Sequence, residues 1–261
     1  MNEAWALGGA YESYVGRWSR LVASNFLEWL AAPAHRRWLD VGCGTGALTE
    51  QIVARYDPHS VLGADSSQQF VTWAAAHLSD PRVSFTVADA TQLPAGVADV
   101  VVSGLVLNFV PDGAAALASM RSAAPRGTIA AYVWDYAGRM DLMRLFWDAA
   151  VALDPAAATL HEGARFPMCT SAALEAIWRD AGLVDVTSAA IDVPTIFSDF
   201  DDFWTPFLGG QGPAPGYVAS LSDAGRHALG ERLRVELPMN ADGSIALIAR
   251  AWAVQGRSPN L

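Results

Sequence analysis

Near the start of the chain, apolar residues recur at the spacing of an amphipathic helix. Between residues 11 and 30 they are Val15, Trp18, Leu21, Val22, Phe26, Trp29 and Leu30. Steps of three and four residues place side chains on one helix face, and Pro33 ends the pattern. The sequence therefore predicts a helix that leads into the core, and we expect residues 1–34 to form an N-terminal helical segment.

From Arg37 onward, short apolar runs alternate with segments of helical spacing. The runs predict strands over 38–41, 60–64, 83–88, 98–103 and 128–135, and the segments between them predict helices over 47–56, 68–78 and 113–124. This alternation is typical of a parallel sheet covered by helices on both faces. We therefore expect an α/β fold with a doubly wound, Rossmann-like sheet.

The C-terminal half continues this alternation more loosely. It predicts helices over 141–153 and 171–181 and strands over 184–193 and 244–254. Thr170 can cap the start of the second helix, and Gly182 follows its end. The alternation thus extends the sheet by two strands.

An insertion, residues 194–240, separates the last two predicted strands. It is rich in aromatic residues and contains the run Gly209-Gly-Gln-Gly-Pro-Ala-Pro-Gly216. We expect residues 35–193 and 241–261 to form the core and the insertion to form a small cap. Three roles stay open for its aromatic side chains: a lid over an apolar substrate, the surface of a homodimer, or simple core. The neighbouring glycine-proline run favours the first two over the third.

Charge and composition exclude several functions. The formal net charge of the 261 residues is −10, and the 17 basic residues are scattered arginines without a stripe for phosphate backbones, so we expect no nucleic-acid partner. The absence of lysine excludes a Schiff-base lysine and a Walker lysine. No apolar run is long enough to cross a bilayer, and the start lacks a signal-peptide pattern, so we expect a cytoplasmic protein without membrane contact.

The two cysteines, Cys43 and Cys169, are too few for a disulfide framework and lack the spacing of zinc ligands. We therefore expect a reduced compartment and no metal.

The segment Asp40-Val-Gly-Cys-Gly-Thr-Gly46 lies where the first strand turns into the first helix. Its glycines allow the backbone to approach a ligand closely. Gly42-x-Gly44-x-x-Ala47 also satisfies the dinucleotide pattern, so the glycines alone leave two cofactors open. Asp40 would repel a pyrophosphate, whereas the sulfonium and ammonium groups of S-adenosylmethionine are compatible with a carboxylate.

With the hydrophobic strand before it, this segment resembles the first motif of the class I S-adenosylmethionine-dependent methyltransferases, of the type 11 kind that includes ubiquinone and menaquinone biosynthesis enzymes. Three further segments, covering about the first half of the chain, resemble that family. They are Leu62-Gly-Ala-Asp65-Ser66, Val87-Ala-Asp89-Ala90, and Ala98 to Asp112. The resemblance implies a seven-stranded, mostly parallel sheet of order 3-2-1-4-5-7-6 and S-adenosylmethionine as the cofactor.

The resemblance also implies which residues contact the cofactor. Asp65 would accept hydrogen bonds from the ribose hydroxyls, a role that a carboxylate at this strand end can also play towards a dinucleotide. Asp89 and Ala90 would meet the adenine. From the leading helix, Tyr14 and Arg17 would lie over the cofactor, with Arg17 pairing to the methionine carboxylate. The full set expected to contact it is Tyr14, Arg17, Asp40, Gly42, Cys43, Gly44, Asp65, Ser66, Asp89, Ala90, Gly104 and Leu105.

The chain departs from the family at Asn108-Phe109, where a His pair or a His-aromatic pair is common. Asparagine cannot accept a proton at neutral pH, although it can orient a substrate. Methyl transfer depends heavily on proximity and orientation, so we expect no indispensable chemical catalyst and name no catalytic residue. The candidate substrate contacts are Asn108, Trp134 and Tyr136, although buried aromatic residues are more often core.

The sequence thus predicts an enzyme that methylates O, N or C of a small molecule. An NAD(P)-dependent oxidoreductase using the same loop is the first alternative, although a chain without lysine cannot contain a Tyr-x-x-x-Lys pair. The second alternative is a protein that binds S-adenosylmethionine without turnover, which the missing His base leaves open.

Overall fold

The computed structural model describes residues 16–209 and 212–259. Its centre is an open seven-stranded sheet of order β3-β2-β1-β4-β5-β7-β6. The pairs β1–β2, β1–β4, β2–β3 and β4–β5 are parallel, and β5–β7 is antiparallel. The predicted fold class and strand order are therefore confirmed.

The strands are β1 (Arg37–Val41), β2 (Ser60–Asp65), β3 (Val83–Val87), β4 (Val100–Gly104), β5 (Thr128–Trp134), β6 (Val184–Phe197) and β7 (Ile245–Arg257). The α-helices are α2 (Arg17–Leu30), α3 (Ala47–Tyr56), α4 (Gln68–His77), α5 (Gly113–Ala123), α6 (Asp141–Leu153), α7 (Glu162–Arg165), α8 (Ser171–Asp180), α9 (Phe200–Trp204), α10 (Pro213–Ser220) and α11 (Asp223–Glu236). Short 3-10 helices are η2 (Leu107–Phe109), η3 (Pro155–Leu160) and η4 (Thr205–Gly209). None of these described helices has the length and apolar character needed to cross a bilayer.

The described chain divides into two compact units. The first, here called the core unit, contains residues 20–134, 168–191 and 251–259. The second, here called the aromatic unit, contains residues 16–19, 135–167, 192–209 and 212–250. The sequence did not predict that 135–167 would group with the segment after β6. The cap expected over 194–240 remains a prediction.

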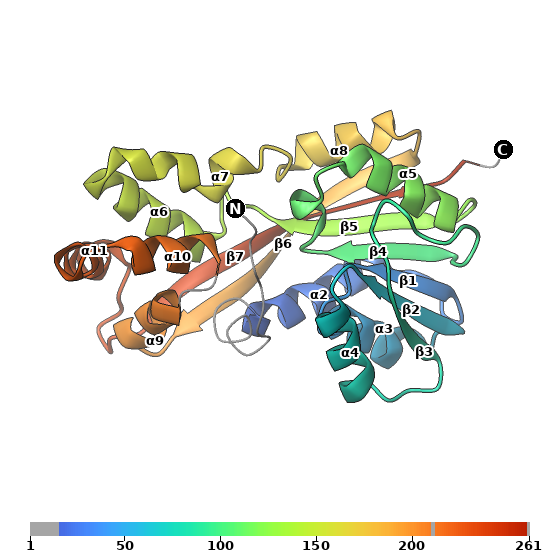
Figure 1. Cartoon of the computed structure of the whole chain (residues 1–261), viewed down its shortest axis with the longest axis horizontal. Coiled ribbons are helices and arrows are strands. Elements are labelled where there is room, and N and C mark those ends of the chain that lie inside the picture. Colours follow the sequence, from blue (N-terminus) through green and yellow to red (C-terminus); the bar gives the residue numbers. More distant parts are fainter. Residues whose placement is uncertain (1–15, 210–211, 260–261) are drawn as a thin grey trace. The chain divides into compact units, whose positions relative to one another are not determined.

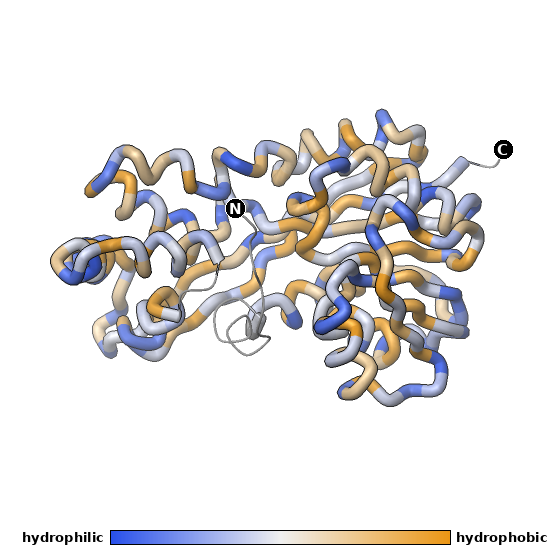
Figure 2. Tube along the Cα trace, viewed as in Figure 1, coloured by the Kyte–Doolittle hydropathy of each residue, from blue (hydrophilic) through white to orange (hydrophobic). Residues whose placement is uncertain are grey.

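In the core unit, burial explains the central strands. Every residue of β5 except Thr128 is buried, and four of the five residues of β4 are buried. A parallel strand covered on both faces is mostly apolar along its length, and Figure 2 shows hydrophobic colour over much of these central strands. β3 lies at the edge of the sheet and is buried at none of its five positions.

Helices cover both faces of the core unit. Figure 1 shows α5 and α8 along one face and α2, α3 and α4 along the other. Trp178 of α8 is buried and donates from Nε1 to the Ile129 carbonyl oxygen, 3.2 Å away. On the opposite face, the rings of Phe26 and Tyr132 lie 4.6 Å apart. These contacts bury the central strands between two helical layers, as the alternating pattern predicted.

Local signals place several helix ends correctly. The Thr170 hydroxyl accepts from the Ala173 N–H at 3.3 Å, so the predicted N-cap of α8 is confirmed. Gly182 follows that helix with φ of 76°, a conformation that favours glycine. Helices α3 and α6 have the predicted bounds. Capping signals in the sequence therefore mark the two ends of α8, whereas the bounds of α3 and α6 follow from their apolar spacing without a side-chain cap.

The last two strands are longer than predicted. β6 continues past Pro194 to Phe197, and β7 reaches Arg257. The predicted insertion began at Pro194, which therefore lies inside the observed strand although proline cannot donate to a ladder. β6 is an edge strand, however, and an edge strand tolerates proline where its N–H would face away from the neighbouring strand.

The aromatic unit is built around a cluster of packed aromatic rings. Phe146 and Phe207 stack with centroids 4.5 Å apart, and Phe203 lies 5.5 Å from Phe207 and 5.2 Å from Phe197. All four rings are almost completely buried. Trp18 adds an edge contact to Phe197 at 5.1 Å. The aromatic residues of the predicted insertion therefore form a core of their own together with α6.

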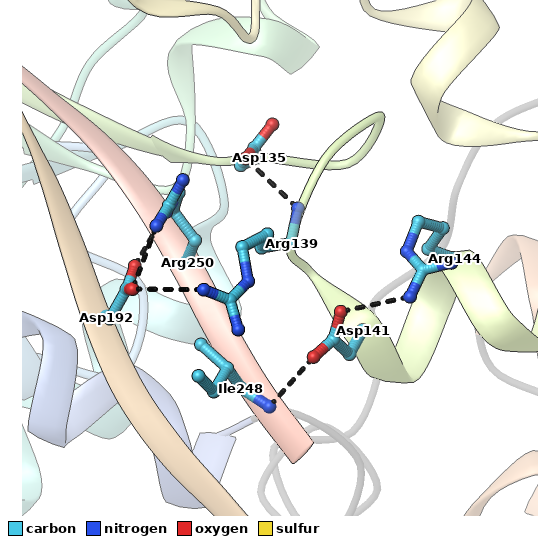
Figure 3. A network of polar contacts seen from close by, with 7 residues as sticks. All are labelled: Asp135, Arg139, Asp141, Arg144, Asp192, Ile248 and Arg250. Carbon is cyan, nitrogen blue, oxygen red and sulfur yellow. Dashed lines mark hydrogen bonds and ion pairs between the residues drawn. The ribbon is translucent and has the colours of Figure 1, made fainter. Parts of the chain in front are cut away.

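A polar network in the aromatic unit fixes the turn after β5 (Figure 3). Asp135 is 5% exposed, and its Oδ2 accepts from the Arg139 N–H at 3.0 Å. Arg250 forms two hydrogen bonds to Asp192 at 2.7 and 2.9 Å, and Arg139 lies 3.8 Å from the same carboxylate. The turn leaves no room for a side chain at Gly138, where a Cβ atom would be 2.2 Å from Asp135 Oδ2.

We expect Gly138→Ala to destabilise this turn. The added methyl group must displace the buried Asp135 carboxylate and break its bond to Arg139, which should lower the free energy of unfolding by about 1–3 kcal/mol. Gly216→Ala is the matched control, because a Cβ at this position in α10 would meet nothing within 4 Å. It should be neutral or stabilise by up to about 1 kcal/mol. Urea unfolding measures both, and equal effects of the two variants would contradict the prediction.

Candidate functional site

The glycine loop between β1 and α3 is held by backbone bonds to β2. The N–H groups of Gly42 and Cys43 both donate to the Ala64 carbonyl oxygen, at 2.7 and 3.1 Å. Gly42, Gly44 and Gly46 have φ values of 72°, 53° and 87°. Residues other than glycine adopt such positive φ values only at an energetic cost, so the path of the backbone requires glycine at all three positions.

Two of these glycines differ in what surrounds them. A Cβ at Gly42 would lie 2.6 Å from both γ-carbons of Val106, so this glycine allows the loop to touch the segment that follows β4. A Cβ at Gly44 would meet nothing within 4 Å. Gly44 therefore borders open space, and its backbone is exposed to whatever occupies that space.

Asp65, the last residue of β2, fixes this loop from the side. Its Oδ2 accepts from the Gly44 N–H at 2.9 Å, and its Oδ1 accepts from the Ser67 N–H at 2.8 Å. Each carboxylate oxygen can accept a further hydrogen bond. The side chain is half-buried, and Ser66 beside it is exposed. Asp65 is thus oriented by the backbone with capacity left for the hydroxyls of a ligand.

Asp89 follows β3 and is exposed. Its Oδ1 accepts from both the N–H and the hydroxyl of Thr91, at 2.8 and 2.7 Å. These bonds favour the charged form and lower the pKa of Asp89. The contacts to Thr91 orient the carboxylate within its own turn, and Ala90 beside it is half-buried.

Asp40 is the most unusual carboxyl group of the loop. It is 1% exposed, its Oδ2 accepts from the Thr49 hydroxyl at 2.7 Å, and its Oδ1 has no partner among the described residues. Burial raises the pKa of Asp40 to about 7, the nearby Asp65 charge raises it as well, and the Thr49 hydrogen bond acts in the opposite direction. An approaching cation would favour the ionised form of this group.

Cys43 lies within the same loop and is 6% exposed. Burial, together with the charges of Asp40 and Asp65, raises the pKa of the Cys43 thiol. A thiol that stays protonated is a poor nucleophile, so the side chain acts as a small packing group.

The end of β4 brings a second turn to the same edge of the sheet. The Ser103 hydroxyl donates to the Val41 carbonyl oxygen at 2.8 Å, which ties β4 to β1. The Leu105 N–H donates to the Tyr132 carbonyl oxygen at 2.8 Å while its own φ is 61°. A leucine in the left-handed region is strained, and such strain is common at functional sites. Gly104 is close-packed, since a Cβ there would lie 2.5 Å from the Tyr132 hydroxyl.

Asn108 follows in η2 and is 8% exposed. Neither its Nδ2 nor its Oδ1 has a hydrogen-bond partner among the described residues. Trp134, at the end of β5, is 3% exposed in the core unit, and Tyr136 is 6% exposed in the aromatic unit. Their substrate roles stay predictions, and their burial is also what core residues would show.

The other predicted contacts lie at the start of the chain. Tyr14 lies outside the described residues. Arg17 begins α2, and its side chain is not among those described. The structure thus gathers the other predicted cofactor contacts along the carboxyl ends of β1 to β4 and leaves the contribution of the leading helix a prediction.

Three residues that support the site were not predicted from the sequence. Thr49 bonds Asp40 from the first helical turn of α3, Val106 contacts the Gly42 backbone, and Ser103 joins two strands. Thr49 had a weak signal, because a hydroxyl close after the loop lies near the strand end. Val106 had none, since an apolar residue after a strand is ordinary.

These residues fit S-adenosylmethionine. The open side of Gly44 admits a ligand to the loop, the oriented Asp65 suits ribose hydroxyls, and the unpartnered Asp40 Oδ1 suits a cationic group at the loop. In the part of the chain that the structure describes, no group of three His, Cys, Asp or Glu side chains could hold a metal ion.

We expect Asp40→Asn to stabilise the protein relative to the wild type, and we expect this stabilisation to increase as the pH rises. The unfolded chain releases the Asp40 proton near 3.8 and the folded chain near 7, so the wild type loses stability across that window. The amide carries no charge at any of these pH values. The gain in unfolding free energy should therefore be small near pH 4 and reach about 2–4 kcal/mol above pH 7.

Urea unfolding from pH 4.5 to 8 measures this difference. Asp180→Asn, at an exposed carboxylate near the end of α8, is the control and should show no comparable rise. The prediction would be contradicted if the difference in unfolding free energy between Asp40→Asn and wild type stayed constant with pH. In that case the Asp40 carboxyl group would not be buried without compensation.

Comparison with known proteins relates this site to a family. A model of the methyltransferase domain matches residues 39–127, which contain the glycine loop and the turn after β4. The trans-aconitate 2-methyltransferase of Methylobacterium radiotolerans is 33% identical over 174 residues, which cover 61% of this chain and 66% of that protein. The enzyme of that name from Methylobacterium nodulans is 40% identical over 108 residues, 41% of this chain and 40% of the relative. The chain thus spans about two fifths to two thirds of these relatives.

Solved structures share the fold. A putative methyltransferase from Bacillus halodurans matches with a TM-score of 0.60 at 12% identity, over 91% of this chain and 99% of that one. A Haemonchus contortus phosphoethanolamine N-methyltransferase in complex with S-adenosyl-L-methionine matches with a TM-score of 0.59 at 15% identity, over 97% of this chain and 57% of that one. Residues 39–127 thus match the methyltransferase domain, and the strand order is the one that the resemblance to the class I S-adenosylmethionine-dependent methyltransferases implied.

Proposed function

We propose that this protein binds S-adenosylmethionine at the carboxyl ends of β1 to β4 and methylates a small molecule. The observation that carries the proposal is the open side of Gly44, whose N–H is bonded to the oriented Asp65 carboxylate. The missing side chain allows a ligand to approach the Gly44 backbone closely, and the Asp65 carboxylate that holds the loop keeps the capacity to accept from the ligand's hydroxyls. The family supports this choice of cofactor and of reaction, and nothing in the site favours a nicotinamide cofactor.

Each part of the site has a role towards the cofactor. Asp65 would accept from the ribose hydroxyls, Asp89 and Ala90 would hold the adenine, and Asp40 would face the cationic end. When bound, S-adenosylmethionine supplies an electrophilic methyl group on a sulfonium sulfur. The protein residues position the acceptor and exclude water, and orientation of this kind is worth about 7–11 kcal/mol of the barrier in well-aligned systems.

The turn after β4 favours an acceptor that needs no base. Asn108 occupies it and cannot take up a proton at neutral pH. A carboxylate acceptor is already ionised at this pH and can attack without losing a proton. The relatives are named trans-aconitate 2-methyltransferase, and trans-aconitate is such a carboxylate. We therefore propose a carboxylic acid as the acceptor, with O-methylation as the reaction.

We expect the wild-type protein to bind S-adenosylmethionine and S-adenosylhomocysteine in calorimetry and to methylate trans-aconitate in a mass-spectrometric assay. Gly44→Ala should weaken the binding of both nucleosides at least about tenfold, because the methyl group enters the ligand's space. The positive φ of Gly44 should cost the fold only about 1–2 kcal/mol.

Gly42→Ala is the comparison. Its clash with Val106 should lower the unfolding free energy more than Gly44→Ala does, because the neighbouring side chain and backbone must move. Binding of NAD(P)H in place of S-adenosylmethionine would reject the proposed cofactor. Binding of S-adenosylmethionine without methyl transfer to any acid of a broad panel would instead indicate a binding protein without turnover.

A further inference from the structure

The Asn108 side chain is buried without a partner. It is 8% exposed, and both of its amide atoms lack a hydrogen-bond partner in the described part of the chain. Ser103, five residues earlier and fully buried, shows the usual arrangement, since its hydroxyl donates to the Val41 carbonyl oxygen. An unpaired buried amide costs about 1–3 kcal/mol, so a fold that keeps one has a reason to do so.

The turn that carries Asn108 is held rigidly. The Phe109 N–H donates to the Val106 carbonyl oxygen at 2.8 Å, and the Val110 N–H donates to the Leu107 carbonyl oxygen at 3.2 Å. Leu105 immediately before it is strained at φ of 61° and bonded to β5. The amide is therefore fixed in place by its backbone, as a recognition group must be.

The same turn is joined to the glycine loop. Val106, two residues before Asn108, is the side chain that Gly42 approaches so closely. β1 and β4 pair in parallel through Asp40 and Val102, so their carboxyl ends and the turns that follow them lie at one edge of the sheet. Ligands of open parallel sheets bind at this edge. Asn108 thus lies beside the place where the proposed cofactor meets the loop.

The chemistry of an amide limits the ligand that it selects. Nδ2 carries two N–H donors and suits a carboxylate, whereas Oδ1 can accept from a hydroxyl or a water. The loop already contains two carboxyl groups, Asp40 and Asp65. A third carboxylate in this turn would further repel an anionic ligand. A neutral donor at this position favours an anionic acceptor over a cationic amine, which an acidic side chain would bind better.

We propose that Asn108 is the specificity-determining residue for the acceptor, and that its Nδ2 donates to the carboxylate of a small polycarboxylic acid. The inference rests on the proposed function and names the group that recognises the substrate class. One carboxylate oxygen of the acceptor would take the hydrogen bond, and the other would form the new O–CH3 bond with the methyl group that S-adenosylmethionine supplies. The S–CH3 bond would break with its electron pair left on sulfur, and S-adenosylhomocysteine would be the leaving product. No proton leaves the acceptor, so the residue needs only to orient it.

Two substitutions at Asn108 test this role. Asn108→Asp keeps the shape, removes the donors and adds a negative charge, and Asn108→Leu keeps the approximate volume without polar atoms. Calorimetry of the protein loaded with S-adenosylhomocysteine measures the affinity for trans-aconitate and for its trimethyl ester without requiring turnover. Asn240→Asp makes the same charge change at an exposed turn and serves as the control.

We expect Asn108→Asp to weaken trans-aconitate binding at least about tenfold, and Asn108→Leu to weaken it about five- to tenfold, with S-adenosylhomocysteine affinity within about twofold of wild type. Binding of the trimethyl ester, which carries no charge, should be weak in all variants. Asn240→Asp should resemble the wild type. Asn108→Leu should also raise the melting temperature, because it removes two unpaired buried polar atoms.

Several results would overturn the inference. One is an unchanged affinity for trans-aconitate in both Asn108 variants, and another is tighter binding of a cationic amine by Asn108→Asp. A lower melting temperature for Asn108→Leu would also contradict the inference, as would a wild-type protein that binds no acid of the panel. Failure of the proposed function looks different. In that case the protein loaded with S-adenosylhomocysteine still binds the acid and shows the effect of Asn108, but the bound acid gains no methyl group.

Discussion

The contact between Gly42 and Val106 is the constraint on which the site depends. It joins the turn after β1 to the turn after β4, and any side chain at position 42 would overlap both γ-carbons of Val106. Because the two strands pair in parallel, their turns start at the same edge of the sheet, and the missing Cβ allows them to meet there. The glycine loop and the Asn108 turn are therefore parts of one structure in the core unit.

Two buried polar groups along this edge are left incompletely satisfied by the fold. Asp40 has one oxygen without a partner, and Asn108 has no partner for either amide atom. Both arrangements cost stability, one through a desolvated carboxyl group and the other through an unpaired amide. The two groups belong to different turns and suit different charges, since a carboxylate attracts a cation and an amide N–H binds an anion. Such a pair matches a reaction between a cationic methyl donor and an anionic acceptor.

The aromatic unit follows a different physical rule. Its interior consists of packed aromatic rings from α6 and from the segment that follows β6, with Phe146 and Phe207 stacked on each other. Some of its polar groups are paired, as in the bonds of Arg250 to Asp192 and of Arg139 to Asp135. Apolar burial dominates this unit, although Thr195 Oγ1 and Arg232 Nε are buried without a hydrogen-bond partner among the described residues.

The sequence by itself determined the fold of the core unit and the loop that carries the chemistry. Buried parallel strands are apolar along their length, capping residues such as Thr170 mark helix ends, and glycines with positive φ have few substitutes, so all of these features are local. Asp40 and Asp65 were found because they follow strands that the same local pattern predicts. The predicted end of β6 at residue 193 was four residues too early, since the extent of an edge strand depends on the whole fold.

Only the tertiary structure decided which groups meet. The support of Asp40 by Thr49, the contact of Val106 with Gly42 and the unpaired state of Asn108 depend on how strands and turns from distant parts of the chain approach one another. Hydrophobic periodicity tells which face of an element is buried, but it does not tell which polar atom finds a partner there. Burial and hydrogen bonding are set by neighbours in space, and for that reason the sequence could name Asn108 as a candidate while only the structure could show its amide without a partner.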